Sequence, residues 1–502
     1  MRLSEKSLGG VCLFHVAGAL LRLGHRFHPS ICSLAEPSPI PMARRSHHPA
    51  IFQKVSMNTR FALSLGLGCT LFAAALHAQP SADLKQKVAA RVETEAGSLV
   101  KLYQHLHANP ELSFQEEKTG QRIAEELRQA GFEVTERIGG HGVVGVLKNG
   151  SGPTIMMRTD LDALPVPEQT GLPYASKAKA IDPDGKEVPV MHACGHDIHM
   201  TSFIGTARVM SALKSEWKGT LVFIGQPAEE RGRGARAMLK DGLFTKFPKP
   251  EKVVALHVAS DAPVGTVGYV PGFALANVDS VDITIRGVGG HGAYPHGAKD
   301  PIVLAAQTVL ALQTIVSREI APTEPAVVTV GSIHGGTKHN IIPDEVTLQL
   351  TLRSYNDQVR AQTIAAIQRI TKGLALAAGV PEDRMPIVKL SDEFTPACYN
   401  DPALTRRLAG VVEQWLGKGT AIERQPVMGG EDFSEYGRTE DKIPISMLWL
   451  GVVNPESVKE SLQKKKALPT IHSPFFAPAA EPSIKTGVTV MSGVLLDLLG
   501  KK

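Results

Sequence analysis

The stretch Met191–Met200, "MHACGHDIHM", holds one cysteine, three histidines and one aspartate within ten residues. Thiolate and imidazole are preferred ligands of zinc and other borderline-soft divalent ions. One loop does not complete a metal site, because such a site needs several ligands converging from different directions. The pattern therefore indicates metal chemistry, provided that other segments bring further ligands to the same place.

Further chemistry-bearing residues stand near the ends of apolar runs that are typical of strands. They are Asp160 and Asp162 in "TIMMRTDLDALP", Glu229 and Glu230 in "GTLVFIGQPAEE", His257 at the end of "KVVALHV", and His472 in "LPTIHSPFF". Taken singly, each has an ordinary interpretation, such as a satisfied core histidine, a turn cap or a solvated pair. Because ligands of open α/β sheets bind outside the carboxyl ends of the strands, we expect these side chains to meet the Cys194 loop.

The adjacent carboxylates Glu229 and Glu230 indicate two separate roles. One can hold metal while the other takes a proton from a metal-activated water and delivers it to a leaving amine. A bound metal lowers the pKa of water from about 16 to about 7, and two ions roughly 3.5–4 Å apart can contact both the water and the scissile carbonyl. The expected chemistry is amide hydrolysis.

The elements that must position these residues alternate between strands and helices, which predicts an α/β fold with a mixed, mostly parallel sheet covered by helices. A β-α-β-β-α-β order from about residue 278 to 392 predicts an inserted two-layer α+β domain. We therefore expect a catalytic domain in two parts, residues 79–277 and 393–502, around this insertion. The short "QKKKA" at Gln463–Ala467 is interpreted as a solvated loop.

The first part of the chain differs from the rest. Residues 57–78 have the layout of a secretory signal peptide, with cleavage near Ala78, and the run is short for a membrane span. We interpret residues 1–56 as an over-extended start without packed structure, and expect export to a periplasm or secretion without a stable membrane anchor. Of the five cysteines, Cys194 and Cys398 follow the cleavage point. An oxidising compartment would allow them to pair, but a metal-bound Cys194 thiolate is the preferred interpretation.

Composition excludes some classes of function. The 502 residues carry a formal charge of +5 spread along the chain, with 43% hydrophobic and 21% charged residues. These values are ordinary for a soluble globular protein. A nucleic-acid partner would require clustered Lys and Arg on one element, and no such cluster is present in the sequence.

Eight motifs occur in the order "RTDLDALP", "MHACGHDIH", "GQPAEE", "ALHV", "GGHGAYPH", "GGTKHNIIPDEV", "GGEDF" and "IHSPFF". In this order the chain resembles the aminoacylase, hippurate hydrolase and auxin-conjugate (IAA-amino acid) hydrolase group. That group is a branch of the dinuclear metallopeptidases that include glutamate carboxypeptidase. The resemblance implies two divalent ions per subunit, with zinc, manganese, cobalt and nickel all open.

The resemblance also implies roles for single residues. The metal ligands would be Cys194, His196, Glu230, His257 and His472. Glu229 would be the general base, and Asp162 the carboxylate that orients a ligand imidazole. Asp160 stands where related branches carry a metal-binding histidine, a ligand that the thiol cluster replaces here.

The inserted domain would be a lid and dimerisation module, which implies a homodimer or homo-oligomer. There His291 would polarise the substrate carbonyl, often in the partner subunit's site, while Asn340 and Arg353 would hold substrate. Arg353 can pair bidentately with an amino-acid carboxylate. Alternatively, Asn340 is a turn residue and Arg353 a surface charge.

The sequence thus predicts an exported metal-dependent amidohydrolase that acts on N-acyl-L-amino acids, a small-molecule substrate class that includes hippurate. A metallo-carboxypeptidase or dipeptidase acting on short peptides is the alternative within enzymes. A non-catalytic metal- or ligand-binding homologue would be expected to have lost the base or a ligand, and the sequence retains all of them.

Overall fold

A computed structural model of the chain describes residues 79–392 and 394–500. The expected over-extended start and the expected signal peptide, residues 1–78, lie outside the described residues. The described part of the chain contains one large sheet, one smaller sheet, and helices that pack on both.

The large sheet has eight strands in the order β1-β2-β6-β3-β7-β18-β8-β17. The pairs β3–β6, β3–β7, β7–β18 and β8–β17 are parallel, and the other three pairs are antiparallel. This is the predicted mixed, mostly parallel sheet. Its strands are β1 (Glu133–Ile138), β2 (Gly142–Asn149), β3 (Thr154–Asp160), β6 (Gly219–Gln226), β7 (Lys252–Pro263), β8 (Val267–Tyr269), β17 (Ala421–Glu423) and β18 (Ile445–Val453).

The sequence explains which strands are central. β3, β6 and β18 are almost wholly buried. The runs of β6 and β18 are mostly apolar, whereas β3 combines the apolar Ile155–Met157 with a buried Arg158 and Asp160. β1 alternates exposed and half-buried residues and lies at the edge. A strand buried on both faces needs a continuous apolar run, whereas an edge strand with one wet face needs alternation.

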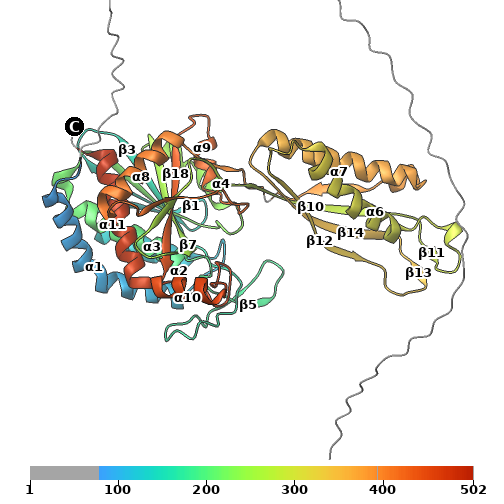
Figure 1. Cartoon of the computed structure of the whole chain (residues 1–502), viewed down its shortest axis with the longest axis horizontal. Helices are drawn as coiled ribbons and strands as arrows, with labels where there is room; N and C mark the ends of the chain where they lie inside the picture. The colour runs from blue at the N-terminus through green and yellow to red at the C-terminus, as the bar shows by residue number, and fades with distance from the viewer. Residues whose placement is uncertain (1–78, 393, 501–502) are drawn as a thin grey trace, which may run out of the picture. The chain divides into compact units, whose positions relative to one another are not determined.

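Helices cover both faces of this sheet (Figure 1). One face packs against α1 (Ala82–Ala108), α2 (Glu117–Gln129), α3 (His196–Ala212), α8 (Pro402–Leu416) and α11 (Ala480–Leu499). The other face packs against the short helices α4 (Gly234–Lys240), α5 (Leu243–Lys246) and α9 (Ser434–Arg438). Helix α1 begins after Ser81, whose hydroxyl caps the helix by accepting the Leu84 N–H.

The smaller sheet has the antiparallel order β12-β14-β10-β15 and two helices on one face. In chain order the elements are β10 (Asn277–Arg286), α6 (Pro301–Thr314), β12 (Ala326–Gly335), β14 (Glu345–Ser354), α7 (Asp357–Ala377) and β15 (Ile387–Leu390). Strand β14 alternates buried and more exposed residues, so one face packs on the helices. We call residues 277–390 the inserted domain.

Short ladders complete the fold. They are β4 (Lys179–Ile181) with β5 (Glu187–Pro189), β9 (Gly272–Leu275) with β16 (Cys398–Asn400), and β11 (Gly290–His291) with β13 (Ile341–Ile342). The remaining pieces are α10 (Pro455–Lys464), the 3-10 turns Lys214–Glu216, Pro295–Gly297 and Glu382–Arg384, and a π-helical turn at Ile315–Glu319.

Two local expectations differ from the structure. His257 is not at the end of its strand, because pairing with β18 carries β7 on to Pro263. Gln463 is not in a loop, because α10 continues to Lys464 and the turn follows it. Among the described residues, the stretch Pro301–Glu319 is long and apolar enough to span a membrane by length and composition, and 33% of it is buried within the protein.

Candidate metal centre

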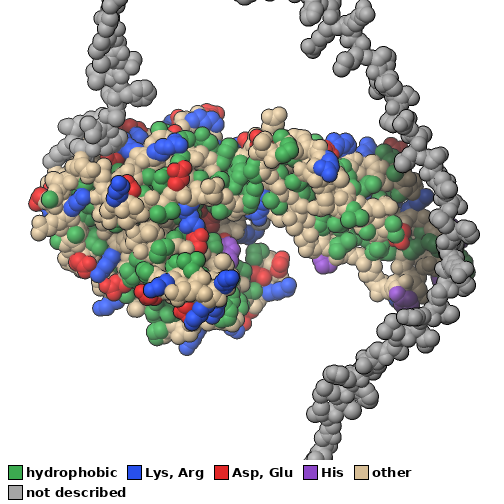
Figure 2. All heavy atoms as spheres, in the orientation of Figure 1, with side chains coloured by type: hydrophobic (Ala, Val, Ile, Leu, Met, Phe, Trp, Pro, Cys, Tyr) green, Lys and Arg blue, Asp and Glu red, His purple; other side chains and the backbone are tan. Residues whose placement is uncertain are grey.

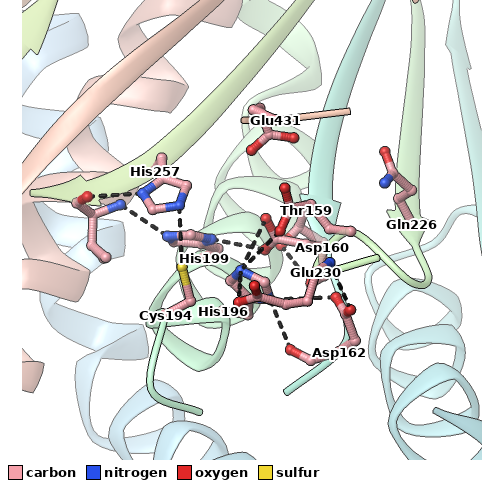
Figure 3. A network of polar contacts seen from close by, with 12 residues as sticks. Thr159, Asp160, Asp162, Cys194, His196, His199, Gln226, Glu230, His257 and Glu431 are labelled. Carbon is pink, nitrogen blue, oxygen red and sulfur yellow. Dashed lines mark hydrogen bonds and ion pairs between the residues drawn. The ribbon is translucent and has the colours of Figure 1, made fainter. Parts of the chain in front are cut away.

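Four separate segments bring the predicted metal ligands together. Figure 3 shows Cys194, His196, Glu230 and His257 from three of them. Cys194 and His196 flank Gly195 at the start of α3, and Glu230 lies in the turn after β6. His257 projects from β7, and His472 comes from the loop before α11. Donor atoms of Cys194, His196 and His257 lie within 4.8 Å of one another, as do those of Cys194, Glu230 and His472.

The distances between these donors leave space for ions. Cys194 Sγ lies 3.5 Å from His257 Nε2, and His472 Nε2 lies 3.6 Å from Glu230 Oε2. His196 Nε2 is 3.8 Å from Glu230 Oε1 and has no hydrogen-bond partner among the described residues, and neither has Glu230 Oε1. Buried polar atoms are normally paired, so these two orphaned atoms fit a cation between them.

The imidazoles are oriented by backbone carbonyls. His257 Nδ1 contacts Val258 O at 2.8 Å, and His196 Nδ1 contacts Asp162 O at 2.7 Å. If each Nδ1 carries its proton toward the carbonyl, each Nε2 is left as a bare lone pair facing the centre. The Asp162 carboxylate is 3.5 Å from the His196 ring, so the orienting contact predicted for Asp162 comes mainly from its main chain.

The Asp162 carboxylate has different partners. Its Oδ2 accepts the Ser113 hydroxyl at 2.6 Å and the Glu230 N–H at 3.0 Å. The main-chain carbonyl of Asp162 therefore orients the His196 ring, and its side chain holds the backbone of Glu230. Both contacts fit the predicted positioning role.

His199 has no free nitrogen for a metal, although it belongs to the same motif. Its Nε2 accepts the Val258 N–H at 2.9 Å, and its Nδ1 donates to Asp160 Oδ1 at 2.7 Å. Burial lowers the pKa of His199 to about 4, so the ring is neutral at pH 7. Its ring links the backbone of β7 to the Asp160 carboxylate by one hydrogen bond on each side.

A buried arginine, which sequence reasoning missed, organises the carboxylates beside the ligands. Arg158 donates to Asp160 Oδ2 at 2.7 Å and to Glu431 Oε1 at 2.9 Å, and its Nη2 lies 3.3 Å from Asp432 Oδ1. The signal in the sequence was a charged residue inside the apolar run "TIMMRTD". A buried arginine is stable only when paired, and Arg158 has its carboxylate partners at the end of β3 and in the loop before α9. Figure 3 shows Glu431 on the side of the cluster opposite Asp162.

The electrostatics of the centre fit divalent cations. Six carboxylates, Asp160, Asp162, Glu229, Glu230, Glu431 and Asp432, surround it, and Arg158 contacts three of them. Burial raises the pKa of Glu230 to about 8, and burial followed by the Glu431 charge raises that of Glu229 well above its usual range. Burial and Glu230 likewise raise the pKa of the Cys194 thiol. Ionising these groups together requires added positive charge, which two divalent ions supply.

The two cysteines of the described chain are not bonded to each other. Cys194 and Cys398 are both free and buried. Cys398 lies on β16 among packed apolar side chains, where burial raises the pKa of its thiol well above the usual range. The Cys194 sulfur is therefore available as a ligand.

The three residues predicted in the inserted domain have different surroundings. His291 is exposed on β11, where its ring lies beside Tyr294 and accepts the Ala293 N–H at 3.0 Å. Asn340 is exposed just before β13. Arg353, on β14, is half-buried, and its Nη1 lies 3.4 Å from Met428 O, two residues before Gly430. Of the three, Arg353 contacts the loop that carries Glu431.

Comparison with known proteins agrees with this geometry. Residues 156–497 match the model of Peptidase family M20/M25/M40. The chain belongs to this family. It is 38% identical to the hippurate hydrolase of Campylobacter jejuni over 68% of this chain and 85% of that protein. It is 34% identical to thermostable carboxypeptidase 2 of Saccharolobus solfataricus over 74% of this chain and 90% of that protein.

A solved structure extends the comparison to the metal centre. The YXEP protein of Bacillus subtilis, described as a dinuclear metal binding peptidase from the M20 family, superposes with a TM-score of 0.65. It is 30% identical, and the match covers 81% of this chain and 99% of that one. The predicted family, the α/β fold and a metal-dependent hydrolase are thereby confirmed for this M20 member.

Proposed function

We propose that this protein is an exported amidohydrolase that cleaves the amide bond of N-acyl-L-amino acids, including hippurate-like substrates. The observation that carries the proposal is the convergence of donors from Cys194, His196, Glu230, His257 and His472 beside a second carboxylate, Glu229. When bound, two divalent cations would supply Lewis-acid chemistry and bring the pKa of water towards neutrality. Zinc, manganese, cobalt and nickel all suit this set of sulfur, nitrogen and oxygen ligands.

Glu229 is the general base of the proposed reaction. Its Oε2 lies 3.8 Å from His196 Nε2, and its carboxylate is grouped with those of Glu230 and Glu431. Glu229 takes a proton from the attacking water and delivers it to the nitrogen of the leaving amine. Cations beside it would offset the burial and the carboxylate repulsion that raise its pKa.

Arg353 is the proposed partner of the substrate carboxylate. Its guanidinium contacts the Thr351 hydroxyl at 3.1 Å and the Met428 carbonyl, both uncharged groups. Burial lowers the pKa of Arg353, and no carboxylate opposes that effect. A half-buried guanidinium with only neutral partners can take a carboxylate bidentately, which favours amides of amino acids over simple amides.

A homodimer through the inserted domain is part of the proposal. Helix α6 exposes Ile302, Val303 and Leu310, and β12 is an edge strand. Figure 2 shows hydrophobic side chains over the visible face of the inserted domain. Apolar patches and unpaired strand edges are typical of association surfaces. His291 and Asn340 would then serve the site of the partner subunit, and export would follow from the signal-like residues 57–78.

The decisive experiment is the Glu229→Gln substitution in the metal-loaded enzyme. We expect retained metal with hydrolysis of hippurate and other N-acyl amino acids reduced by about 10²–10⁴-fold, the range for loss of a general acid–base group. The pH dependence of turnover should lose its acidic limb. Normal turnover of the variant would exclude Glu229 as the base.

A carboxypeptidase or dipeptidase activity is the second candidate, supported by the similarity to thermostable carboxypeptidase 2. The same centre and the same Arg353 carboxylate site would serve a short peptide. Release rates from matched pairs of benzoyl-amino acids and dipeptides with the same C-terminal residue separate the two. Higher kcat/KM on the dipeptides would favour the second candidate.

A further inference from the structure

The turn that carries Glu229 and Glu230 has a strained backbone. Ala228, directly before the pair, has φ +49°, in the left-handed region that non-glycine residues rarely adopt. The turn is also tight, since a Cβ at Gly234 would lie 1.5 Å from Pro227 O. A strained turn of this kind persists only where the surroundings hold it.

Two carboxylates hold this turn, one on each side of Glu229. Asp162 Oδ2 accepts the N–H of Glu230 at 3.0 Å. Glu116 Oε1 accepts the N–H of Ala228 at 2.7 Å. The donors are the main-chain groups directly before and after Glu229, so the two contacts together set the direction in which Glu229 and Glu230 leave the turn.

The Glu116 carboxylate accepts the distant Ala228 N–H, and its other main-chain neighbours, Phe114 and Glu116 itself, are local. It lies directly before α2, is 0% exposed, and its second oxygen has no hydrogen-bond partner among the described residues. Placing a carboxylate in a fully buried position is costly. A glutamate that merely packed the start of α2 would have no need to reach a residue 112 positions further along the chain.

We infer that Glu116 is a positioning residue for the Glu229-Glu230 pair, acting through its hydrogen bond to the Ala228 N–H. This inference rests on the proposed roles of Glu229 and Glu230, but not on the identity of the substrate. It predicts that the acceptor atom matters and that the negative charge does not. Glu116→Gln keeps an oxygen at the same place, whereas Glu116→Leu removes it at similar volume.

The test compares these two variants in the Co²⁺-loaded full chain. We expect Glu116→Leu to lower kcat by about 10–100-fold and to weaken Co²⁺ affinity within the same range, the usual effect of losing an outer-shell contact. Its visible Co²⁺ spectrum should change, because Glu230 moves. KM should change by less than about threefold, since no substrate contact is altered. Glu116→Gln should match the wild type in all four readouts.

Asp401→Ala is the matched control. Asp401 Oδ1 also accepts a backbone N–H, that of Leu404 at the start of α8, at 2.7 Å. Its loss should lower the unfolding midpoint without changing kcat or the Co²⁺ spectrum. If Glu116→Leu behaves like this control, or if Glu116→Gln loses as much activity as Glu116→Leu, the inference is wrong.

Glu116→Leu is also tested in a second genetic background, Ala228→Gly, in case Glu116→Leu alone folds poorly. Ala228→Gly makes φ +49° nearly free of strain, so the Glu116→Leu penalty should shrink there. A penalty of equal size in both backgrounds would show that Glu116 does not act through Ala228. If the wild type cleaves no N-acyl amino acid, the proposed function fails, but the Co²⁺ spectrum still decides the role of Glu116.

Discussion

The candidate metal centre and the predicted substrate-binding residues of the inserted domain are built in different ways. In the metal centre, five predicted ligands from four segments converge, and buried groups orient them. In the inserted domain, His291 and Asn340 are exposed, and the His291 ring contacts Tyr294 and the Ala293 N–H within its own loop. The predicted ligands of the metal centre all come from one chain, whereas the roles proposed for His291 and Asn340 involve a substrate or a second subunit.

The largest effect is expected from Cys194→Ala. Losing the thiolate should release metal and lower activity by about 10³-fold or more, because several kcal/mol of charge stabilisation disappear. Cys398→Ala is the control, since this buried thiol lies on β16 and is not in the ligand groups. Metal analysis and turnover should separate the two variants. A Cys194→Ala protein with two bound ions and normal turnover would contradict the ligand assignment.

His291→Ala should lower kcat by about 10²–10³-fold, as for loss of a group that stabilises developing charge, with metal content unchanged. The comparison becomes sharper when this variant is mixed with Glu229→Gln. If His291 serves the partner's site, hybrid dimers contain one intact site and activity returns. If His291 serves its own subunit, every site in the mixture has a defect and activity stays low.

Arg353→Ala should raise KM for acyl-amino acids by about 10–100-fold, since a charged hydrogen bond contributes about 1.5–3 kcal/mol. The effect should vanish for an amide substrate without a carboxylate. Arg369→Ala is the control, because this exposed arginine pairs with Glu319 on the surface. Equal losses with both substrate types would exclude a role in carboxylate binding.

The smallest effect concerns the pH dependence of the free energy of unfolding, through a buried histidine, His107, near the metal centre. His107 contacts Asp197 at 2.7 Å and Glu168 at 3.1 Å, and although burial opposes it, these carboxylates raise its pKa to about 10. The folded pKa exceeds the unfolded value of about 6.5. Its contribution is therefore fully present below pH 6.5 and is lost as the pH rises towards 10.

The matching variant is His107→Gln, with the free energy of unfolding measured between pH 6 and pH 9.5. We expect His107→Gln to lower the free energy of unfolding by about 1–3 kcal/mol at pH 6, the scale of charged hydrogen bonds. The loss should be smaller at pH 9.5. If the difference in free energy of unfolding between the wild type and His107→Gln does not shrink as the pH rises, His107 is not charged in the folded protein.

The convergence of these side chains could be predicted in large part, because each predicted ligand has a distinctive residue type within a recognisable local motif. A thiol beside imidazoles, a Glu-Glu pair and a histidine in an apolar run are recognisable one segment at a time. Arg158, Asp432 and Glu116 were not predicted as site residues, because their roles depend on partners 273, 197 and 112 positions away. The end of β7 was misplaced for the same reason, since β18 extends it.

By itself, the sequence determined which side chains can bind metal or carry a proton and which elements alternate, since these follow from side-chain chemistry and local periodicity. Only the tertiary structure decided which imidazole faces the centre with a free nitrogen. His196 and His199 share one motif, yet the first leaves Nε2 open and the second uses both nitrogens. That choice depends on tertiary contacts, because β7 and the end of β3 supply a partner to each nitrogen of His199, whereas His196 receives one at Nδ1 only.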